Sequence, residues 1–86
     1  MGAESETAVA AEIRRYLADT SGRPLQEILD SEPLLDGLLD SIGLLSLAAH
    51  LEERYGIAIG AGEVDPGNFG TLTALSAFVA RKAGAA

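Results

Sequence analysis

Apolar residues recur every three or four positions in three stretches of the chain, a spacing that places side chains on one face of an α-helix. The pattern predicts helices over residues 7–18, from residue 41 or 42 to 55, and from 72 to about 82, of which the second is the most regular. The positions expected to form the buried stripes are Val9, Ile13, Tyr16, Leu17, Leu44, Leu47, Leu51, Tyr55, Leu72, Leu75, Phe78 and Val79.

Residues at the ends of these stretches support the assignment. The segment DTSGRP, residues 19–24, stops the first helix through its glycine and proline. Gly56 is placed to end the second helix, and Arg54 lies in its last turn, where a cation suits the helix dipole. Thr71 precedes the last helix and is expected to cap it.

The connection between the first two helices is long, at roughly twenty residues, and a structureless loop of that length is uncommon in a compact domain. It contains PLQEILD, which can form a helical turn, and EPLLDG, a proline-started turn that ends at Gly37. We therefore expect an ordered crossover that packs on the core. The side chains expected to pin it are Leu25, Ile28, Leu29, Leu34 and Leu35.

After the second helix, several glycines and Pro66 break regular structure, while VDPGNF can make a short helical turn and Ile57 and Ile59 can anchor the segment. Together these elements predict an all-α fold, a small four-helix bundle with three main helices, a short third helix and a long first crossover loop. We expect residues 1–86 to form a single domain, with an ordered core over about 7–82 and a frayed start.

The charge balance restricts the partners. Thirteen acids against six bases give a net charge of −7, which argues against nucleic acid and against anionic membranes as partners and favours a partner with a basic surface.

The chain has no apolar run long enough to span a bilayer, and its first residues lack the basic and apolar regions of a secretory signal. We therefore expect a cytoplasmic protein.

Side chains suited to catalysis are scarce. The chain has one histidine, His50, and no cysteine. Ser41 and His50 are nine residues apart on one predicted helix, about 13.5 Å along its axis, so they cannot pair as nucleophile and base. Neither a zinc site, an EF-hand nor a dinucleotide-binding glycine motif is present, and Glu52 and Glu53 are expected to be solvated surface charges. The sequence thus predicts neither an enzyme nor a metal site.

The start of the second helix offers other chemistry. Asp40-Ser41 before an apolar run is typical of an ordinary N-cap. A helix N-terminus also favours a phosphate group, through its free N–H groups and its positive dipole end. Ile42, Leu45 and Ala49 form a second apolar stripe on this helix. That stripe is either a surface for a partner or ligand, or is covered by the crossover and the short helix.

Over about residues 7 to 82 the sequence resembles the carrier-protein family, which includes acyl and peptidyl carrier proteins. Asp40-Ser41-Ile42 matches the family motif that opens the second helix, LEERYGI is similar to its usual helix end, and NFGTLTALSAFV to its last connection and helix. The resemblance implies that a phosphopantetheinyl transferase attaches 4′-phosphopantetheine from coenzyme A to Ser41. The thiol of this group would then hold cargo as a thioester. By the same resemblance, the residues that partners recognise would be Asp40, Ile42, Leu45 and Ala49.

The implied partners are this transferase, an adenylating or acyl-transferring loading enzyme, and downstream acyl-processing enzymes with basic docking surfaces; a carrier that visits several enzymes is expected to be a monomer. No Lys or Arg lies between Arg23 and Arg54, a segment that holds seven acids, which suits such partners. Gly43 and Ser46 stand where fatty-acid carriers usually have acids. The segment therefore looks closer to discrete carriers of bacterial specialised metabolism, of polyketide or nonribosomal peptide type.

Three alternatives stay open at this point. Two lie within the carrier class, namely a D-alanyl carrier and a fatty-acid carrier. The third is a helical module that binds partners non-covalently through Ile42, Leu45 and Ala49 and needs no modification of Ser41.

Overall fold

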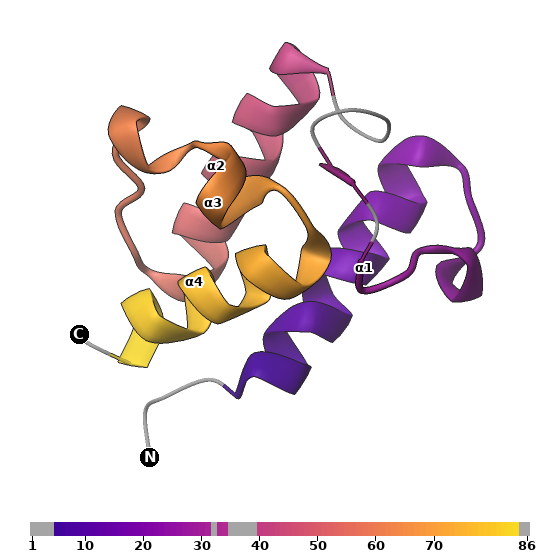
Figure 1. Ribbon diagram of the computed structural model, residues 1–86, viewed down its shortest axis with the longest axis horizontal. Helices are drawn as coiled ribbons and strands as arrows, with labels where there is room; N and C mark the ends of the chain where they lie inside the picture. Colours follow the sequence, from indigo (N-terminus) through magenta and orange to yellow (C-terminus); the bar gives the residue numbers. More distant parts are fainter. Residues whose placement is uncertain (1–4, 32, 35–39, 85–86) are drawn as a thin grey trace.

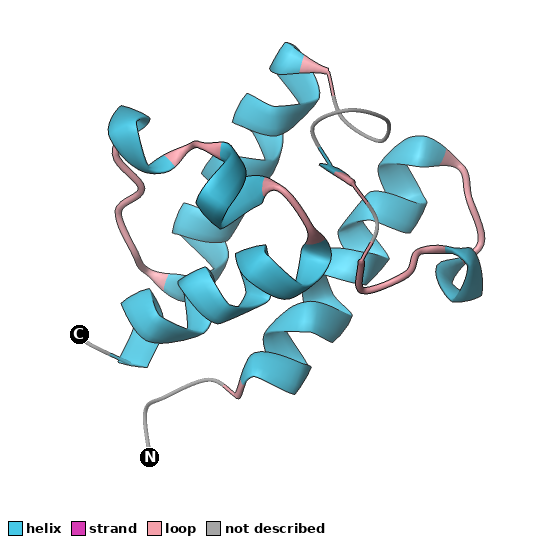
Figure 2. Ribbon diagram, viewed as in Figure 1, coloured by secondary structure: helices cyan, strands magenta, loops and turns pink. Residues whose placement is uncertain are grey.

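The computed structural model describes residues 5–31, 33–34 and 40–84, with the backbone only at Ser41. Within these residues the chain forms four α-helices and two short 3-10 turns, and its one β-type contact is an isolated bridge between Pro33 and Thr71 (Figures 1 and 2). The predicted all-α fold with a short third helix is confirmed. The elements are α1 (Glu6–Ser21), η1 (Leu25–Glu27), α2 (Ser41–Tyr55), η3 (Ala61–Glu63), α3 (Pro66–Phe69) and α4 (Leu72–Gly84).

Helix α1 is longer at its C-terminal end than the prediction of 7–18. It ends where Gly22 adopts a left-handed backbone (φ 76°) and donates its N–H to the Ala18 carbonyl at 3.0 Å. Thr20 is accommodated in the last turn because its hydroxyl donates to the Tyr16 carbonyl at 3.0 Å. The helix therefore ends at the glycine named in the prediction, and Asp19, Thr20 and Ser21 form its last turn.

The start of α4 and both ends of α2 agree with the prediction. The Thr71 hydroxyl accepts the Ala74 N–H at 3.1 Å, as expected of a cap. Helix α2 ends at Gly56, whose φ is 65°, with Arg54 in the last turn. Helix α4 continues to Gly84, slightly beyond the expected end at Lys82.

The core lies between α1, α2 and α4, with α4 packed across α1 and α3 resting on α4 (Figure 1). The three stripes that were predicted to be buried point into it, although Tyr16, Leu44 and Tyr55 are only partly buried. Phe69 brings α3 into the core, with its ring centroid 5.9 Å from that of Phe78. The buried apolar residues are Val9, Ile13, Leu17, Ile28, Leu34, Leu47, Ala48, Leu51, Phe69, Leu72, Leu75, Phe78 and Val79.

The crossover between α1 and α2 is pinned by fewer side chains than predicted. Ile28 and Leu34 are buried, but Leu25 and Leu29 are exposed, so the prediction for these two leucines is wrong. Backbone hydrogen bonds hold the segment instead: the Leu34 N–H donates to the Gly70 carbonyl at 2.9 Å, and the Thr73 N–H to the Asp30 carbonyl at 3.0 Å. Leu35 and the turn that ends at Gly37 lie outside the described residues.

The loop after α2 is ordered by two glutamates. The Glu52 carboxylate accepts the Ile59 N–H at 2.8 Å, so Glu52 is not the purely solvated charge that we expected. Glu63, at the end of η3, accepts the Gly60 N–H at 2.9 Å and pairs with Lys82 of α4 at 2.9 Å. These contacts hold Ile57 and Ile59, both partly buried, against the core as predicted.

Acidification should weaken this loop through Glu63. The Gly60 N–H, and then the Lys82 ammonium, lower the pKa of the Glu63 carboxyl below its usual value. A carboxyl with a lowered pKa stabilises the fold above its unfolded-state pKa, and this contribution is lost as the pH falls through the folded-state value. Glu63→Gln should therefore make the free energy of unfolding fall less steeply below about pH 4.5.

Urea unfolding followed by circular dichroism at a series of pH values measures this effect. Glu53→Gln is the matched control, because Glu53 is exposed on α2. Equal acid slopes for the Glu63→Gln variant and the wild type would show that the Gly60 and Lys82 contacts do not couple to folding.

Candidate functional site at the start of helix α2

Asp40 sets where α2 begins. Its backbone is extended (φ −90°, ψ −175°), its carboxylate accepts the Gly43 N–H at 2.7 Å, and its carbonyl accepts the Leu44 N–H at 2.9 Å. The N-cap expected at Asp40-Ser41 is thus Asp40, and Ser41 is the first helical residue. Helix geometry does not require the Ser41 hydroxyl, which leaves that residue available for another role.

The face of α2 that follows Ser41 is apolar and open to solvent. Ile42 is 76% exposed and Leu45 is 66% exposed, and Ala49 one turn further along is also exposed. The buried stripe on the same helix is carried by Leu47 and Leu51. The interpretation that the crossover and the short helix cover both stripes is therefore wrong.

The four residues predicted for partner recognition are all exposed, Asp40 at the N-cap of α2 and Ile42, Leu45 and Ala49 on the helix itself. Their solvent exposure is what a docking surface requires. The structure tests the role of none of them in binding, so their recognition role stays a prediction.

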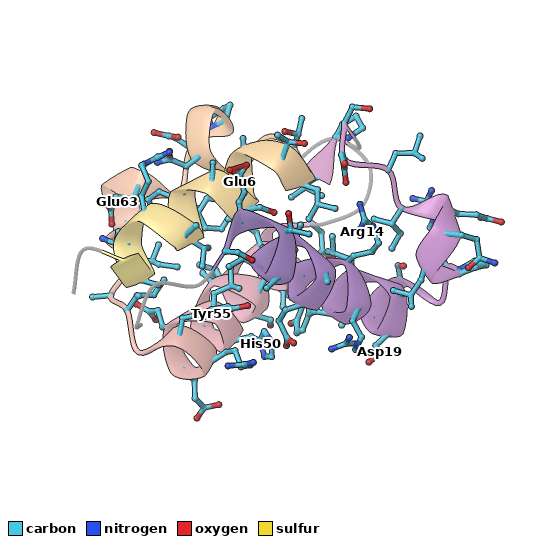
Figure 3. All side chains as sticks on the ribbon, turned by 90° about the horizontal axis from the view of Figure 1, so that it is seen from below. Glu6, Arg14, Asp19, His50, Tyr55 and Glu63 are labelled. Atoms are coloured by element: carbon cyan, nitrogen blue, oxygen red, sulfur yellow. The ribbon has the colours of Figure 1, made fainter. Side chains whose placement is uncertain are left out.

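His50 lies away from this surface, at the boundary between α2 and α1 (Figure 3). Its Nε2 is 3.2 Å from a Glu12 carboxylate oxygen, and its ring stacks on Tyr16 with 4.6 Å between centroids. The Glu12 carboxylate also lies within ion-pair distance of Arg15 and Arg54. His50 is half-buried, and its contacts join α2 to α1.

The contact between Glu12 and His50 was not predicted from the sequence. Glu12 and His50 are 38 residues apart and carry no shared motif, so only the packing of α1 on α2 brings them together. In the described part of the chain, no group of three or more His, Cys, Asp or Glu side chains could hold a metal ion, and no helix is both long and apolar enough to cross a membrane.

The acids in the segment without Lys or Arg differ in how far they are available to a partner. Glu52 is partly buried and accepts the Ile59 N–H, and Asp30 pairs with Arg14 but stays exposed. Glu27, Asp40 and Glu53 are exposed as well. Glu32 and Asp36 lie outside the described residues. The structure therefore leaves four of the five described acids of this segment exposed to solvent.

The first turn of α2 suits a phosphodiester. The N–H groups that open an α-helix have no partner within the helix, and the dipole there favours a negative charge. Asp40 takes the third of these donors, the Gly43 N–H, and leaves those of Ser41 and Ile42 without an intrahelical acceptor. Asp40 and Ile42, on either side of Ser41 in the chain, are exposed to solvent.

The hydrogen bond by which Asp40 caps α2 can be separated from its negative charge by substitution. Asp40→Ala should lower the free energy of unfolding by about 1 kcal/mol, because the Gly43 N–H loses its acceptor. Asp40→Asn retains an oxygen that can accept this bond and should cost only a few tenths of that amount. Urea unfolding of both variants measures the difference, and equal losses would contradict the capping role.

The chain is similar to a known protein family. A family model described as the phosphopantetheine attachment site matches residues 11–79, a range that includes all of α2 and the greater part of α1 and α4. No curated protein shows a significant match to the chain.

Proposed function

Because the chain belongs to the phosphopantetheine-attachment family, we propose that it is a discrete carrier protein whose attachment point is the Ser41 hydroxyl. Proteins of this family carry covalently attached 4′-phosphopantetheine and act as carriers without catalysis of their own. When bound, the group supplies a terminal thiol that can hold acyl or aminoacyl cargo as a thioester.

One observation carries the choice of Ser41. It is the first helical residue of α2, directly after an exposed cap that already completes the helix start. The hydroxyl would attack the phosphorus that bears the pantetheine in coenzyme A, and the bond to the nucleotide half would break. The hydroxyl proton would pass to a base of the transferase, whose site also holds the magnesium ion, so the carrier needs no base of its own.

The exposed stripe of Ile42, Leu45 and Ala49 supports a finer proposal about the partners. An apolar docking face with Gly43 and Ser46 in place of acids fits the loading and processing enzymes of bacterial specialised metabolism, of polyketide or nonribosomal peptide type, better than those of fatty-acid synthesis. We place the protein in the cytoplasm as a monomer. A D-alanyl carrier and a fatty-acid carrier are the competing assignments, and loading of the modified protein by ligases for amino acids, D-alanine or fatty acids separates them.

The same stripe favours a second candidate function, a helical module that docks on partners without modification. The two functions differ in one respect, since only a carrier gains mass from coenzyme A. Intact-protein mass spectrometry after incubation with a broad-specificity phosphopantetheinyl transferase, coenzyme A and magnesium is the test. A gain of one phosphopantetheinyl group supports the carrier, and a folded protein that gains none supports the docking module.

A further inference from the structure

The crossover is bound to the short segment that joins α3 to α4. The Leu34 N–H donates to the Gly70 carbonyl at 2.9 Å, and the Asp30 carbonyl accepts both the N–H and the hydroxyl of Thr73, at 3.0 and 3.1 Å. Figure 1 shows the crossover passing beside the start of α4. We call residues 70–73 the α3–α4 junction. This junction holds the crossover through bonds that reach 43 positions along the chain.

The same junction is packed tightly on α3. Phe69, the last residue of α3 and its one buried residue, comes directly before Gly70. A Cβ atom added at Gly70 would clash with the Pro66 carbonyl oxygen, so only glycine lets the junction approach the first turn of α3 this closely. Because this contact is made by backbone on both sides, we expect the junction and α3 to move together.

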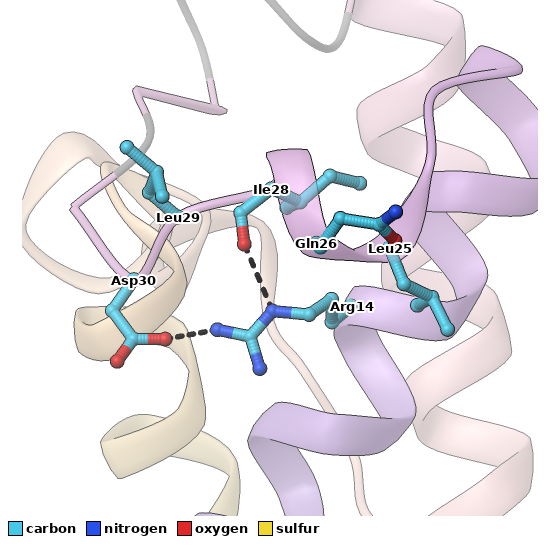
Figure 4. Close-up of a pocket in the computed structure, with 6 residues that line it drawn as sticks. All are labelled: Arg14, Leu25, Gln26, Ile28, Leu29 and Asp30. Carbon is cyan, nitrogen blue, oxygen red and sulfur yellow. Dashed lines mark hydrogen bonds and ion pairs between the residues drawn. The ribbon is translucent and has the colours of Figure 1, made fainter.

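On its other side the crossover contacts α1 through Arg14. Figure 4 shows Arg14 reaching from α1 to the Ile28 carbonyl, at 2.9 Å, and to the Asp30 carboxylate. The Asp30 side chain is 69% exposed, so solvent screens this ion pair and it contributes little to holding the crossover. Leu34, in contrast, is buried, so no water can replace the Gly70 carbonyl as the acceptor of its N–H. Arg14 therefore holds Ile28, whereas the end of the crossover is held by the junction.

We propose that the end of the crossover, residues 30–31 and 33–34, opens together with α3 and the α3–α4 junction as one cooperative unit. Each of the two segments is held by the other, so the opening of one removes contacts that stabilise the other. A partner that displaces α3 therefore loosens the segment that precedes Ser41 without touching it. This coupling is a property of the fold and does not depend on modification of Ser41.

Native-state hydrogen exchange of the ¹⁵N-labelled full-length protein, with urea added in small steps, tests this coupling. Two amides report on the two parts of the unit: the Leu34 N–H on the crossover, and on α3 the Phe69 N–H, which donates to the Asp65 carbonyl at 2.7 Å. We expect both amides to have the same protection and the same dependence on urea, because one opening exposes both. Their protection should be lower than that of Leu17 in the core of α1.

Two threonine variants make the test specific. Thr73→Val removes the hydroxyl that donates to the Asp30 carbonyl and keeps the backbone N–H. It should speed exchange at residues 34 and 69 by the same factor, about two- to tenfold, as expected for the loss of one hydrogen bond. Thr20→Val is the matched control, because the Thr20 hydroxyl donates to a carbonyl within α1. It should leave both amides unchanged, since α1 stays folded when the unit opens.

Three results would overturn the proposal. If Thr73→Val speeds exchange at residue 34 but not at residue 69, the crossover opens on its own. If Thr20→Val speeds both amides as much as Thr73→Val does, they exchange only when the whole protein unfolds. Phe69→Leu gives the reverse test, because faster exchange on α3 must then be matched at residue 34, and a Leu34 amide that exchanges as in the wild type contradicts the coupling.

Discussion

Ser41→Ala should abolish the gain of a phosphopantetheinyl group while leaving the protein folded. The substitution removes the attacking oxygen, and no other group at the start of α2 can form the phosphodiester in its place. The helix start survives because Asp40, not Ser41, accepts the Gly43 and Leu44 N–H groups. Intact-protein mass spectrometry measures the loss, and the circular dichroism spectrum should match that of the wild type.

Ser46→Ala is the matched control for this prediction. Ser46 is exposed on the same helix, so it tests whether any accessible serine of α2 can be modified. We expect it to gain the group in full. A Ser41→Ala protein that still gains the group, or a Ser46→Ala protein that does not, would place the attachment point elsewhere.

Phe69→Ala should have the largest effect on stability, about 3–5 kcal/mol, which is the usual cost of removing a fully buried aromatic ring. Helix α3 comprises only Pro66–Phe69, too short to be stable without packing. Phe69 is its one buried residue and contacts the ring of Phe78 on α4. Small domains are stable by only about 5–15 kcal/mol, so this variant should be unfolded in part at moderate temperature.

The urea midpoint measures this loss, and Phe69→Leu is the comparison. Leucine keeps most of the apolar volume and should cost less than half as much as alanine. A Phe69→Ala protein as stable as the wild type would mean that α3 is not held to the core through this ring.

The sequence was sufficient for the helices because each main helix has a continuous apolar stripe and a recognisable end. Gly56 correctly predicted the end of α2 and Thr71 the start of α4, because a left-handed glycine and a capping hydroxyl act locally. The prediction named the correct stop, Gly22, whose left-handed backbone ends α1, but it ended the helix at residue 18, whereas the structure continues it to Ser21.

The crossover could not be predicted in the same way. Composition indicated that five apolar residues would face the core, but the segment is held by backbone bonds to Gly70 and Thr73, far along the chain. With those bonds in place, Leu25 and Leu29 are free to face solvent. The Glu12–His50 contact escaped prediction for the same reason, since it depends on how two helices pack.

The candidate site could be predicted from the sequence only in part. The motif Asp40-Ser41-Ile42 pointed to the start of α2 from the sequence, because a helix start and a hydroxyl are both local features. Which of two apolar stripes would be exposed required the packing of the whole bundle. The structure answers this by burying Leu47 and Leu51 and leaving Ile42 and Leu45 in solvent.

Locating the modified atom tests the central claim most directly. Trypsin does not cut before Pro24, and no Lys or Arg lies between Arg23 and Arg54, so one peptide of the modified protein contains Ser21, Ser31, Ser41 and Ser46. Electron-transfer fragmentation of that peptide assigns the added mass to a single residue. Our account predicts one phosphopantetheinyl group on Ser41, and the same group on Ser21, Ser31 or Ser46, or no modified peptide at all, would contradict it.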